Sequence, residues 1–331
     1  MAAKPAGSGP GKNPSDDLVR ELMTELGRAF DLSTALGDRT LGAAVEDRIR
    51  SLELGEKPEW GTDGALTQLA KQESGALDFY YRPHLFPDMD PALRLGHRLQ
   101  FDLLPRHLPE ESPLRIAAVL ESYCHLSGDL LGWRLESDEL FLWIVDVSGH
   151  GVRAGLAAAT LYFLINSIEK GLSPARFSKR INEGVLAARN PEDPGALFAT
   201  GIWLRAEAGG RVTYASAGHH PIVLLRSGGE VEYLGSTGIP LGLIARRTFE
   251  ERQFELVEGD ALCLFTDGLV EARSPDEEEF GTDRLVDVRR GWSGSPMELT
   301  RAIYLAVREH QATSLLDDDL TFMVVERSEG A

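Results

Sequence analysis

The chain has 331 residues, of which 43% are apolar and 26% are charged, which is close to ordinary globular usage. This length suggests about two domains, and the composition excludes collagen-like, wholly disordered and disulfide-rich classes. The net charge of −18 would repel a phosphate backbone, so we expect no nucleic-acid partner. The longest nearly apolar run, 155–165, is too short for a membrane span, which needs about 20 residues.

The first part of the chain carries no chemical motif. Residues 1–15 are rich in Gly, Pro, Ala and Ser, which predicts a disordered tail. Apolar residues then recur every three to four positions, a pattern that indicates helices. We therefore assign 16–90 to a helical regulatory or dimerisation region, 91–108 to a linker helix and 109–327 to the chemistry-bearing domain. The region 16–90 would bind an upstream regulatory protein or a second copy of the chain; a passive helical cap is the alternative.

Two features bear on the compartment in which the protein works. The first dozen residues contain no apolar segment of the secretory type. Cys124 and Cys263 both lie among apolar residues, which is typical of reduced cysteines in a core. We therefore expect a cytoplasmic protein without disulfides.

After Pro113 the pattern changes to short apolar runs separated by turn residues. It predicts strands at 115–121, 133–135, 140–145, 197–205, 211–217, 221–226, 230–234, 251–256, 260–266 and 320–325. Helices are expected over 155–170, from Ser173 onward and from Ser295 onward, where Glu298 completes a capping box. Runs of antiparallel strands with helices grouped between them indicate an α+β fold in which helices pack on sheets.

Acidic residues stand at the ends of several of these strands. They are Asp129, Asp146, Asp267, Asp318 and Asp319. A carboxylate next to a buried strand is costly unless something satisfies it. Each one alone is explained by a turn or a helix cap, but together they suit hard cations such as Mg²⁺ or Mn²⁺. Two such ions can activate water and bind a phosphoryl group.

The segment after Asp146 supports this interpretation. Val147-Ser148-Gly149-His150-Gly151 contains two glycines, which allow a tight turn that brings a backbone carbonyl to a metal. His150 is interpreted equally as a proton donor and as a solvated loop residue. The chain has no GxxxxGK[ST], GxSxG, HExxH or paired CxxC, which leaves P-loop, α/β-hydrolase, zincin and zinc-ribbon interpretations without support.

Residues 99–327 resemble the bacterial SpoIIE/RsbU branch of the PPM (protein phosphatase 2C-like) serine/threonine phosphatases. Nine segments in the family's order and spacing carry the resemblance: Leu99-Gln100 with Leu103-Leu104-Pro105, Ser127-Gly128-Asp129, Asp146 to Gly151, Phe198-Ala199-Thr200, Ala217-Gly218-His219, Pro240-Leu241-Gly242, Thr266-Asp267-Gly268 with Glu271-Ala272, Phe280-Gly281, and Asp318-Asp319-Leu320-Thr321. The resemblance implies a PPM-type α-β-β-α sandwich, with two packed antiparallel sheets flanked by helices.

The resemblance also implies two divalent metal ions, Mn²⁺ or Mg²⁺, between the sheets. By motif, Asp146 would bridge both ions and the carbonyl of Val147 would bind one of them. Asp267 and Asp318 would complete the ligands of the second ion. Asp129 would bind directly or through water.

Three further residues have roles that the resemblance leaves less defined. Asp319 would be an additional neighbour of the metals. His150 would be the general acid, although relatives often have Lys or Asn there. His219 belongs to the family's Ala-Gly-His turn and would be structural or would support a ligand.

The function that the resemblance implies is removal of phosphate from phosphoserine or phosphothreonine, without a covalent enzyme intermediate. The substrate would be a phosphorylated STAS-domain protein, an anti-anti-sigma regulator in bacterial partner-switching signalling. One alternative is a signalling scaffold of the same fold without turnover. Another is a metal-dependent hydrolase of small phosphate esters.

Overall fold

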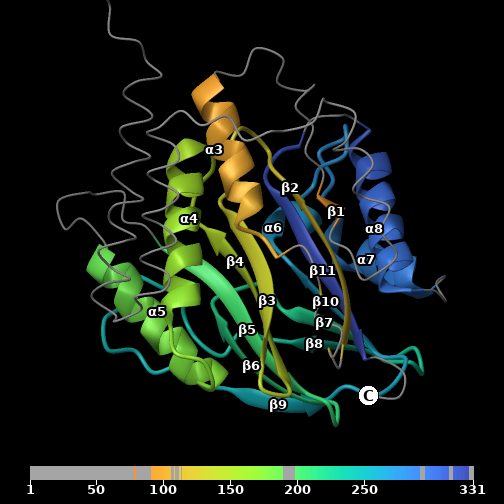
Figure 1. Ribbon diagram of the computed structural model, residues 1–331. Coiled ribbons are helices and arrows are strands. Elements are labelled where there is room, and N and C mark those ends of the chain that lie inside the picture. The colour runs from red at the N-terminus through yellow and green to blue at the C-terminus, as the bar shows by residue number, and fades with distance from the viewer. Residues whose placement is uncertain are drawn as a thin grey trace, which may run out of the picture.

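The computed structural model describes residues 78–79, 91–105, 108, 112, 114–188, 198–290, 295–312 and 316–327. Two β-sheets pack face to face, with helices on the outer face of each (Figure 1). The predicted α+β sandwich is therefore confirmed. Most of the region 16–90 lies outside the described residues, and the two that are described, Asp78–Phe79, form a strand inside a region expected to be helical.

The first sheet has the strand order β1-β2-β11-β10-β7-β8. Its strands are β1 (Asp78–Phe79), β2 (Leu114–Glu121), β11 (Leu320–Arg327), β10 (Ala261–Phe265), β7 (Ile222–Leu225) and β8 (Val231–Leu234). Neighbouring strands are antiparallel, except that β1 pairs with β2 in parallel. The two central strands, β11 and β10, therefore come from the last third of the chain, and β2 beside them comes from its middle third.

The second sheet is antiparallel throughout, in the order β3-β4-β5-β6-β9. Its strands are β3 (Asp129–Glu136), β4 (Glu139–Val147), β5 (Ala199–Glu207), β6 (Arg211–Ala217) and β9 (Arg252–Glu255). β5 and β6 form a hairpin, and Gly210 supplies the positive φ of 89° that its turn requires. β3 is longer than the predicted 133–135 because Gly132 and its neighbours pair with β4 from Asp129 onward.

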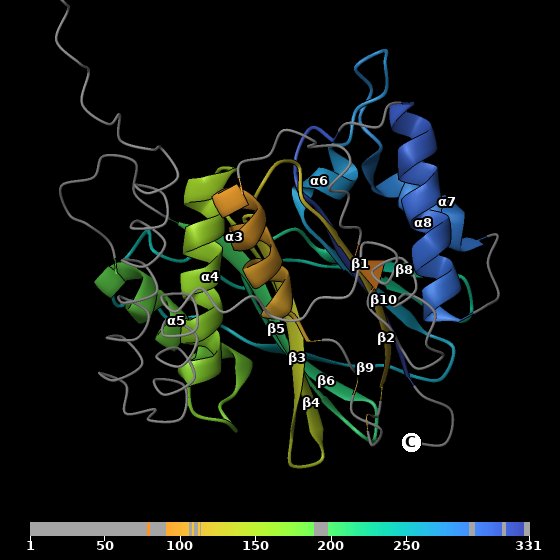
Figure 2. The same cartoon turned by 45° about the horizontal axis from the view of Figure 1, so that its top comes forward.

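Helices cover both outer faces (Figure 2). The second sheet carries α4 (Val152–Ser167) and α5 (Pro174–Ala188), and α3 (Pro91–Asp102) lies beside α4. The first sheet carries α6 (Asp267–Val270), α7 (Gly281–Arg290) and α8 (Pro296–Gln311). The capping box predicted at Ser295 is present, while α6 and α7 were not predicted. α3 ends at Asp102, earlier than the assigned linker helix, as expected shortly before Pro105.

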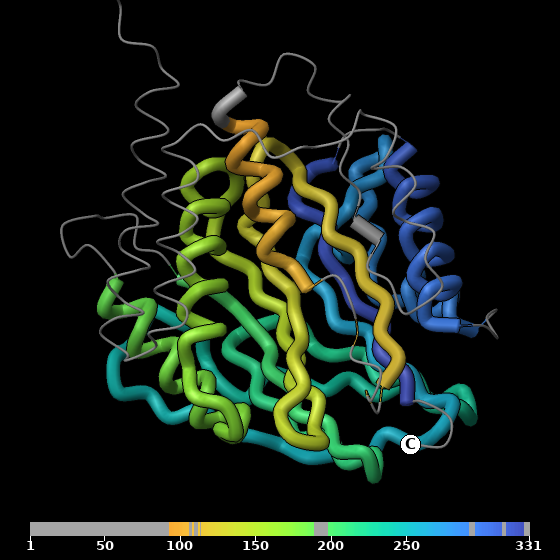
Figure 3. The backbone as a smooth tube through the Cα atoms, viewed as in Figure 1, coloured from red at the N-terminus to blue at the C-terminus, as the bar shows by residue number. Residues whose placement is uncertain are grey.

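Apolar side chains fill three layers, one between the sheets and one under each set of helices. The layer between the sheets is built from alternate residues of each strand, such as Leu142 and Ile144 on β4, because successive side chains point to opposite faces. The tube in Figure 3 shows β2, β11 and β10 running alongside β3 and β4 in the facing sheet. None of the described helices combines the length and apolar character that a membrane crossing requires.

Candidate metal centre

The face between the sheets changes from apolar to polar at one end of the sandwich. On β4 the inward position after Ile144 is Asp146, and on β5 the inward position before Ile202 is Thr200. The register pairs Asp129 with Asp146 and Asp146 with Thr200, so the three side chains form one row across β3, β4 and β5. The fold therefore brings together two of the carboxylates that the sequence singled out.

The facing sheet supplies the other side of this polar end. The inward position after Leu264 of β10 is Thr266, which lies directly beyond the end of the strand and is fully buried. The Thr266 hydroxyl donates a hydrogen bond of 2.8 Å to Oδ2 of Asp129. This bond joins the two sheets and fixes the orientation of the buried Asp129 carboxylate.

Asp267 begins α6 directly after Thr266, and Asp318 lies in the loop before β11. Gly268 explains how α6 approaches that loop so closely. A Cβ at position 268 would lie 2.1 Å from the carbonyl oxygen of Asp319, a distance that no side chain tolerates. The glycine therefore places Asp267 beside Asp318.

Asp319 is buried and holds a loop in place. Its Oδ1 accepts a hydrogen bond of 2.7 Å from the backbone N–H of Tyr123, and its Oδ2 accepts one of 2.7 Å from the backbone N–H of Gly128. Asp129 follows Gly128 directly. Both oxygens of Asp319 thus hold the segment that carries Asp129.

Helix α3 reaches the same segment. Gln100 on α3 accepts a hydrogen bond of 2.9 Å from the backbone N–H of Ser127 and donates one of 2.5 Å to the Ser127 carbonyl. Its amide also lies 3.5 Å from the carbonyl of Gly155 on α4. The Gln100 side chain of α3 is therefore hydrogen-bonded to the backbone of Ser127, which lies two residues before Asp129.

The carboxylates at this end shift one another's protonation. Burial, followed by the negative charges of Asp267, Asp318 and Asp319, raises the pKa of Asp146 from 3.8 to about 7. Burial, together with Asp146 and Asp319, raises the pKa of Asp129 well above its usual value. Burial also raises the pKa of Asp319 to about 6, and the partial desolvation of its carboxyl group raises the pKa of Asp318.

No lysine or arginine among the described residues forms an ion pair with any of these five carboxylates. In the described part of the chain the cluster is therefore a concentration of negative charge without a paired Lys or Arg, and its donors are all oxygen. Hard divalent cations prefer such donors, and bound cations would relieve the repulsion that raises these pKa values. The donor set fits the divalent metal ions that the family resemblance implies.

His219 connects the polar ends of the two sheets. Its Nε2 lies 3.0 Å from the carbonyl oxygen of Phe265, which can only accept, so Nε2 carries the proton and donates. Burial lowers the pKa of His219 to about 3, so the ring is neutral and Nδ1 accepts the 2.7 Å hydrogen bond from the Thr200 hydroxyl. Thr200 also lies beside the Asp146 carboxylate. A chain of contacts therefore runs from β10 to Asp146.

His150 lies at the rim of the site. Its side chain is exposed, and its ring stands edge-on against Tyr123 with 5.4 Å between ring centroids. The electrostatic effect of His150 partly offsets the rise in the pKa of Asp318, which places the imidazole near that carboxylate. Val147 is the last residue of β4, and the next residue, Ser148, donates its backbone N–H to the carbonyl of Phe198.

Sequence reasoning gave no role to Thr200 and Thr266, although both contact the carboxylates. Each occupies an inward position of its strand, two residues from a buried apolar residue of the same face. The two-residue period of a strand could have revealed them once the inward face was known.

The family model of stage II sporulation protein E (SpoIIE) matches residues 136–328. The chain belongs to the SpoIIE family. Among curated SpoIIE-like relatives, IcfG of Synechocystis sp. is 28% identical and phosphoserine phosphatase RsbU of Bacillus subtilis is 26% identical. The match covers 71% of this chain and 41% of IcfG, and 72% of this chain and 71% of RsbU. The chain thus spans less than half of IcfG.

Solved structures agree with the fold. The SiaA-PP2C domain of Pseudomonas aeruginosa superimposes with a TM-score of 0.64 at 18% identity, covering 75% of this chain and all of that domain. RsbX, solved in complex with magnesium, superimposes with a TM-score of 0.50 at 18% identity, covering 65% of this chain and 96% of RsbX. At this identity the likeness shows a PP2C-type fold, and the member of the SpoIIE family described here has that fold.

Proposed function

We propose that the protein is a metal-dependent phosphatase that removes phosphate from phosphoserine or phosphothreonine in a STAS-domain protein. The observation that carries the proposal is the group of carboxylates from both sheets, without a cationic partner among the described residues, at the polar end of a SpoIIE-family domain. The name of the relative RsbU, a phosphoserine phosphatase, supports the reaction. The substrate protein is inferred from the family resemblance alone.

In this proposal two divalent ions, Mn²⁺ or Mg²⁺, are held by carboxylates of both sheets. The proposed ligands are Asp129, Asp146, the carbonyl of Val147, Asp267 and Asp318. When bound, the ions supply positive charge for the phosphoryl oxygens and lower the pKa of bound water. The negative charges of Asp267, Asp318 and Asp319 all act on Asp146 and raise its pKa, which fits its proposed role as a ligand of both ions.

The remaining residues of the site position these ligands. Thr266 and Asp319 fix Asp129, the first through its carboxylate and the second through the loop before it. The Thr200 hydroxyl gives its only proton to His219, so it presents oxygen lone pairs toward the site. His150 stands at the rim, where it can meet a phosphoprotein and where a proton donor to the leaving serine oxygen would stand.

The test of the proposal is turnover of a phosphorylated STAS protein after exhaustive chelation and after return of Mn²⁺ or Mg²⁺. We expect chelation to abolish turnover and either ion to restore it. Alkylation under native conditions should leave turnover unchanged, because Cys263 is buried and burial raises the pKa of both Cys263 and Cys124. Turnover that survives chelation would contradict the proposal.

Two further measurements separate this function from its alternatives. A small-ester hydrolase would turn over p-nitrophenyl phosphate but leave the phosphorylated STAS protein unchanged. A scaffold would bind the STAS protein without turnover under any metal. Either result would replace the proposed function.

We also propose that the N-terminal region regulates this site through α3. The Gln100 bonds to Ser127 support the proposal, because a shift of α3 would move the segment that carries Asp129. Gln100→Ala should therefore change the turnover number. Leu95→Ala on the same helix is the control, because Leu95 is exposed. Equal turnover in both variants and the unaltered protein would refute regulation of the site through α3.

A further inference from the structure

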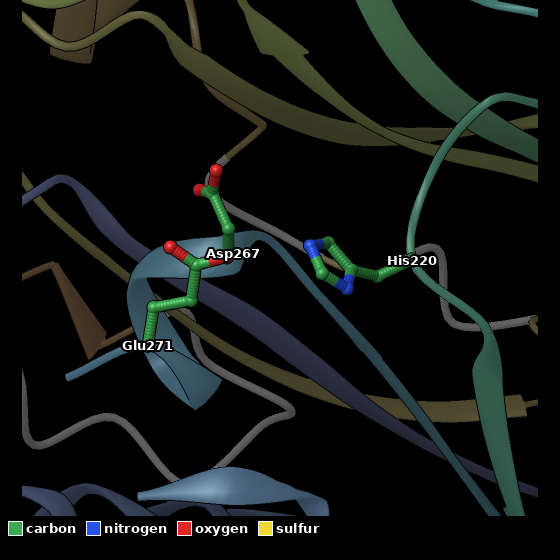
Figure 4. Close-up of side chains that lie close together, drawn as sticks. All are labelled: His220, Asp267 and Glu271. Carbon is green, nitrogen blue, oxygen red and sulfur yellow. The ribbon is translucent and has the colours of Figure 1, made fainter. Parts of the chain in front are cut away.

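Next to the carboxylates at the strand ends lies a second group of side chains that bind metals in other proteins. One ligand atom from each of His220, Asp267 and Glu271 lies within 4.8 Å of the others. Figure 4 shows the His220 ring, which comes from the connection between β6 and β7, directed toward the carboxylates carried by α6. Asp267 belongs to the proposed phosphatase centre, whereas His220 and Glu271 have no part in it.

The His220 ring is held in this place by its surroundings. Its chain neighbour His219 is fixed by hydrogen bonds to Thr200 and to the carbonyl of Phe265. The ring itself packs against Phe265, with 6.0 Å between ring centroids. Ordering the imidazole beside the carboxylates therefore costs little additional conformational entropy on binding.

The three side chains have no other polar partner in the part of the chain that the structure describes. No described residue hydrogen-bonds to the His220 ring nitrogens, and no described Lys or Arg pairs with the carboxylate of Asp267 or Glu271. Asp267 and Glu271 stand one helical turn apart, so their side chains lie on the same side of the helix, and a carboxylate oxygen of each lies within 4.8 Å of a His220 ring nitrogen. A proton shared with His220 or a metal ion would satisfy this arrangement.

The donor set separates this group from the phosphatase centre. The proposed phosphatase ligands are all oxygen, which suits Mg²⁺ and Mn²⁺, whereas an imidazole nitrogen suits Zn²⁺ and related transition metals. Zn²⁺ sites with an open fourth position have three protein ligands, which can include imidazole nitrogen and carboxylate oxygen. Divalent ions of both classes would therefore use the Asp267 carboxylate as a ligand.

We propose that His220, Asp267 and Glu271 form a separate site for a Zn²⁺-class transition-metal ion, and that its occupation inhibits the phosphatase. The inhibition rests on the proposed function: an ion at this site competes for the Asp267 carboxylate and repels a cation in the adjacent centre. The binding itself does not depend on that function.

The full-length chain is first freed of metal and then placed in buffer with excess Mg²⁺. Zn²⁺ is titrated into this sample, and binding is measured by calorimetry. Co²⁺ replaces Zn²⁺ in a parallel titration that is followed by absorption spectroscopy. The variants are His220→Asn and Glu271→Gln. Matched controls are His310→Asn on α8 and Glu258→Gln, an exposed glutamate. We expect one Zn²⁺ site that persists in Mg²⁺, and an affinity reduced by about 10- to 100-fold or more in both variants but in neither control. Zn²⁺ binding that is equal in all five proteins, or absent in Mg²⁺, would overturn the proposal.

The activity arm uses the same proteins at saturating Mg²⁺. Low Zn²⁺ should inhibit the unaltered protein and both controls, whereas His220→Asn and Glu271→Gln should keep their basal turnover and resist inhibition. Inhibition that is equal in all five would refute the inhibitory role. Zn²⁺ binding as expected, with no phosphatase turnover in any protein, would refute the proposed function and leave the site standing.

Discussion

The cost of ionising Asp146 in the metal-free fold gives a sharp prediction. In the unfolded chain Asp146 loses its proton near pH 3.8, and in the metal-free fold near pH 7, because burial and the neighbouring aspartates disfavour its charge. The folded chain therefore binds this proton more tightly, and its free energy of unfolding falls as the pH rises through that window. At 1.36 kcal/mol per pH unit, the loss at pH 8 is about 4 kcal/mol.

Asp146→Asn removes this loss, because the amide has no charge to bury. In EDTA at pH 8 the variant should gain about 2–4 kcal/mol over the unaltered protein, allowing for relaxation of the site. A gain of that size corresponds to about 5–15 °C in the thermal midpoint for a domain of this length. The gain should shrink as the pH falls and vanish near pH 4.

The assay is thermal and urea unfolding in EDTA between pH 4 and pH 8. Asp138→Asn is the control, because Asp138 is exposed in the turn between β3 and β4. Mn²⁺ should reverse the order, because it stabilises the unaltered protein more than Asp146→Asn. Equal stability of the two proteins at pH 8 in EDTA, or a difference that does not change with pH, would refute the electrostatic reasoning.

Two other predictions follow from the contacts around the site. Gly268→Ala should lower the free energy of unfolding by about 1–3 kcal/mol and weaken Mn²⁺ binding, since the new Cβ would meet the carbonyl of Asp319. Gly209→Ala is the control, because a Cβ at position 209 would meet no atom within 4 Å. Equal Mn²⁺ affinities of the two variants by calorimetry would contradict the prediction. His219→Leu leaves the Phe265 carbonyl and the Thr200 hydroxyl without their partner, so it should cost about 1–3 kcal/mol of stability and lower kcat with KM nearly unchanged. A loss of stability with kcat intact would limit His219 to a structural role.

The sandwich could be predicted from the sequence because its signals are local. Alternating apolar residues mark the strands, and Ser295 with Glu298 marks the start of α8. The elements that were missed lack such signals. α6 has only four residues, and half of the residues of α7 are charged, with Leu285 and Val286 as its buried side chains.

The candidate site was predictable only as a set of aspartates at strand ends. Their contacts depend on strand register and on sheet packing, which a single sequence does not specify. Thr266 reaches Asp129 across 137 positions of the chain. His219 and His220 stand together in one turn, yet only the fold directs one to Thr200 and the other to α6.

Turnover of a phosphorylated STAS protein by single aspartate variants in saturating Mn²⁺ tests the central claim most directly. We expect Asp146→Asn to lower turnover by roughly 10³-fold or more, equivalent to about 4 kcal/mol of lost stabilisation, because both proposed ions lose a shared anion. Asp267→Asn and Asp318→Asn should cost less, since each weakens one ion, and Asp138→Asn should be neutral. If Asp146→Asn binds two Mn²⁺ ions and turns over at a rate near that of the unaltered protein, the proposed metal centre is wrong.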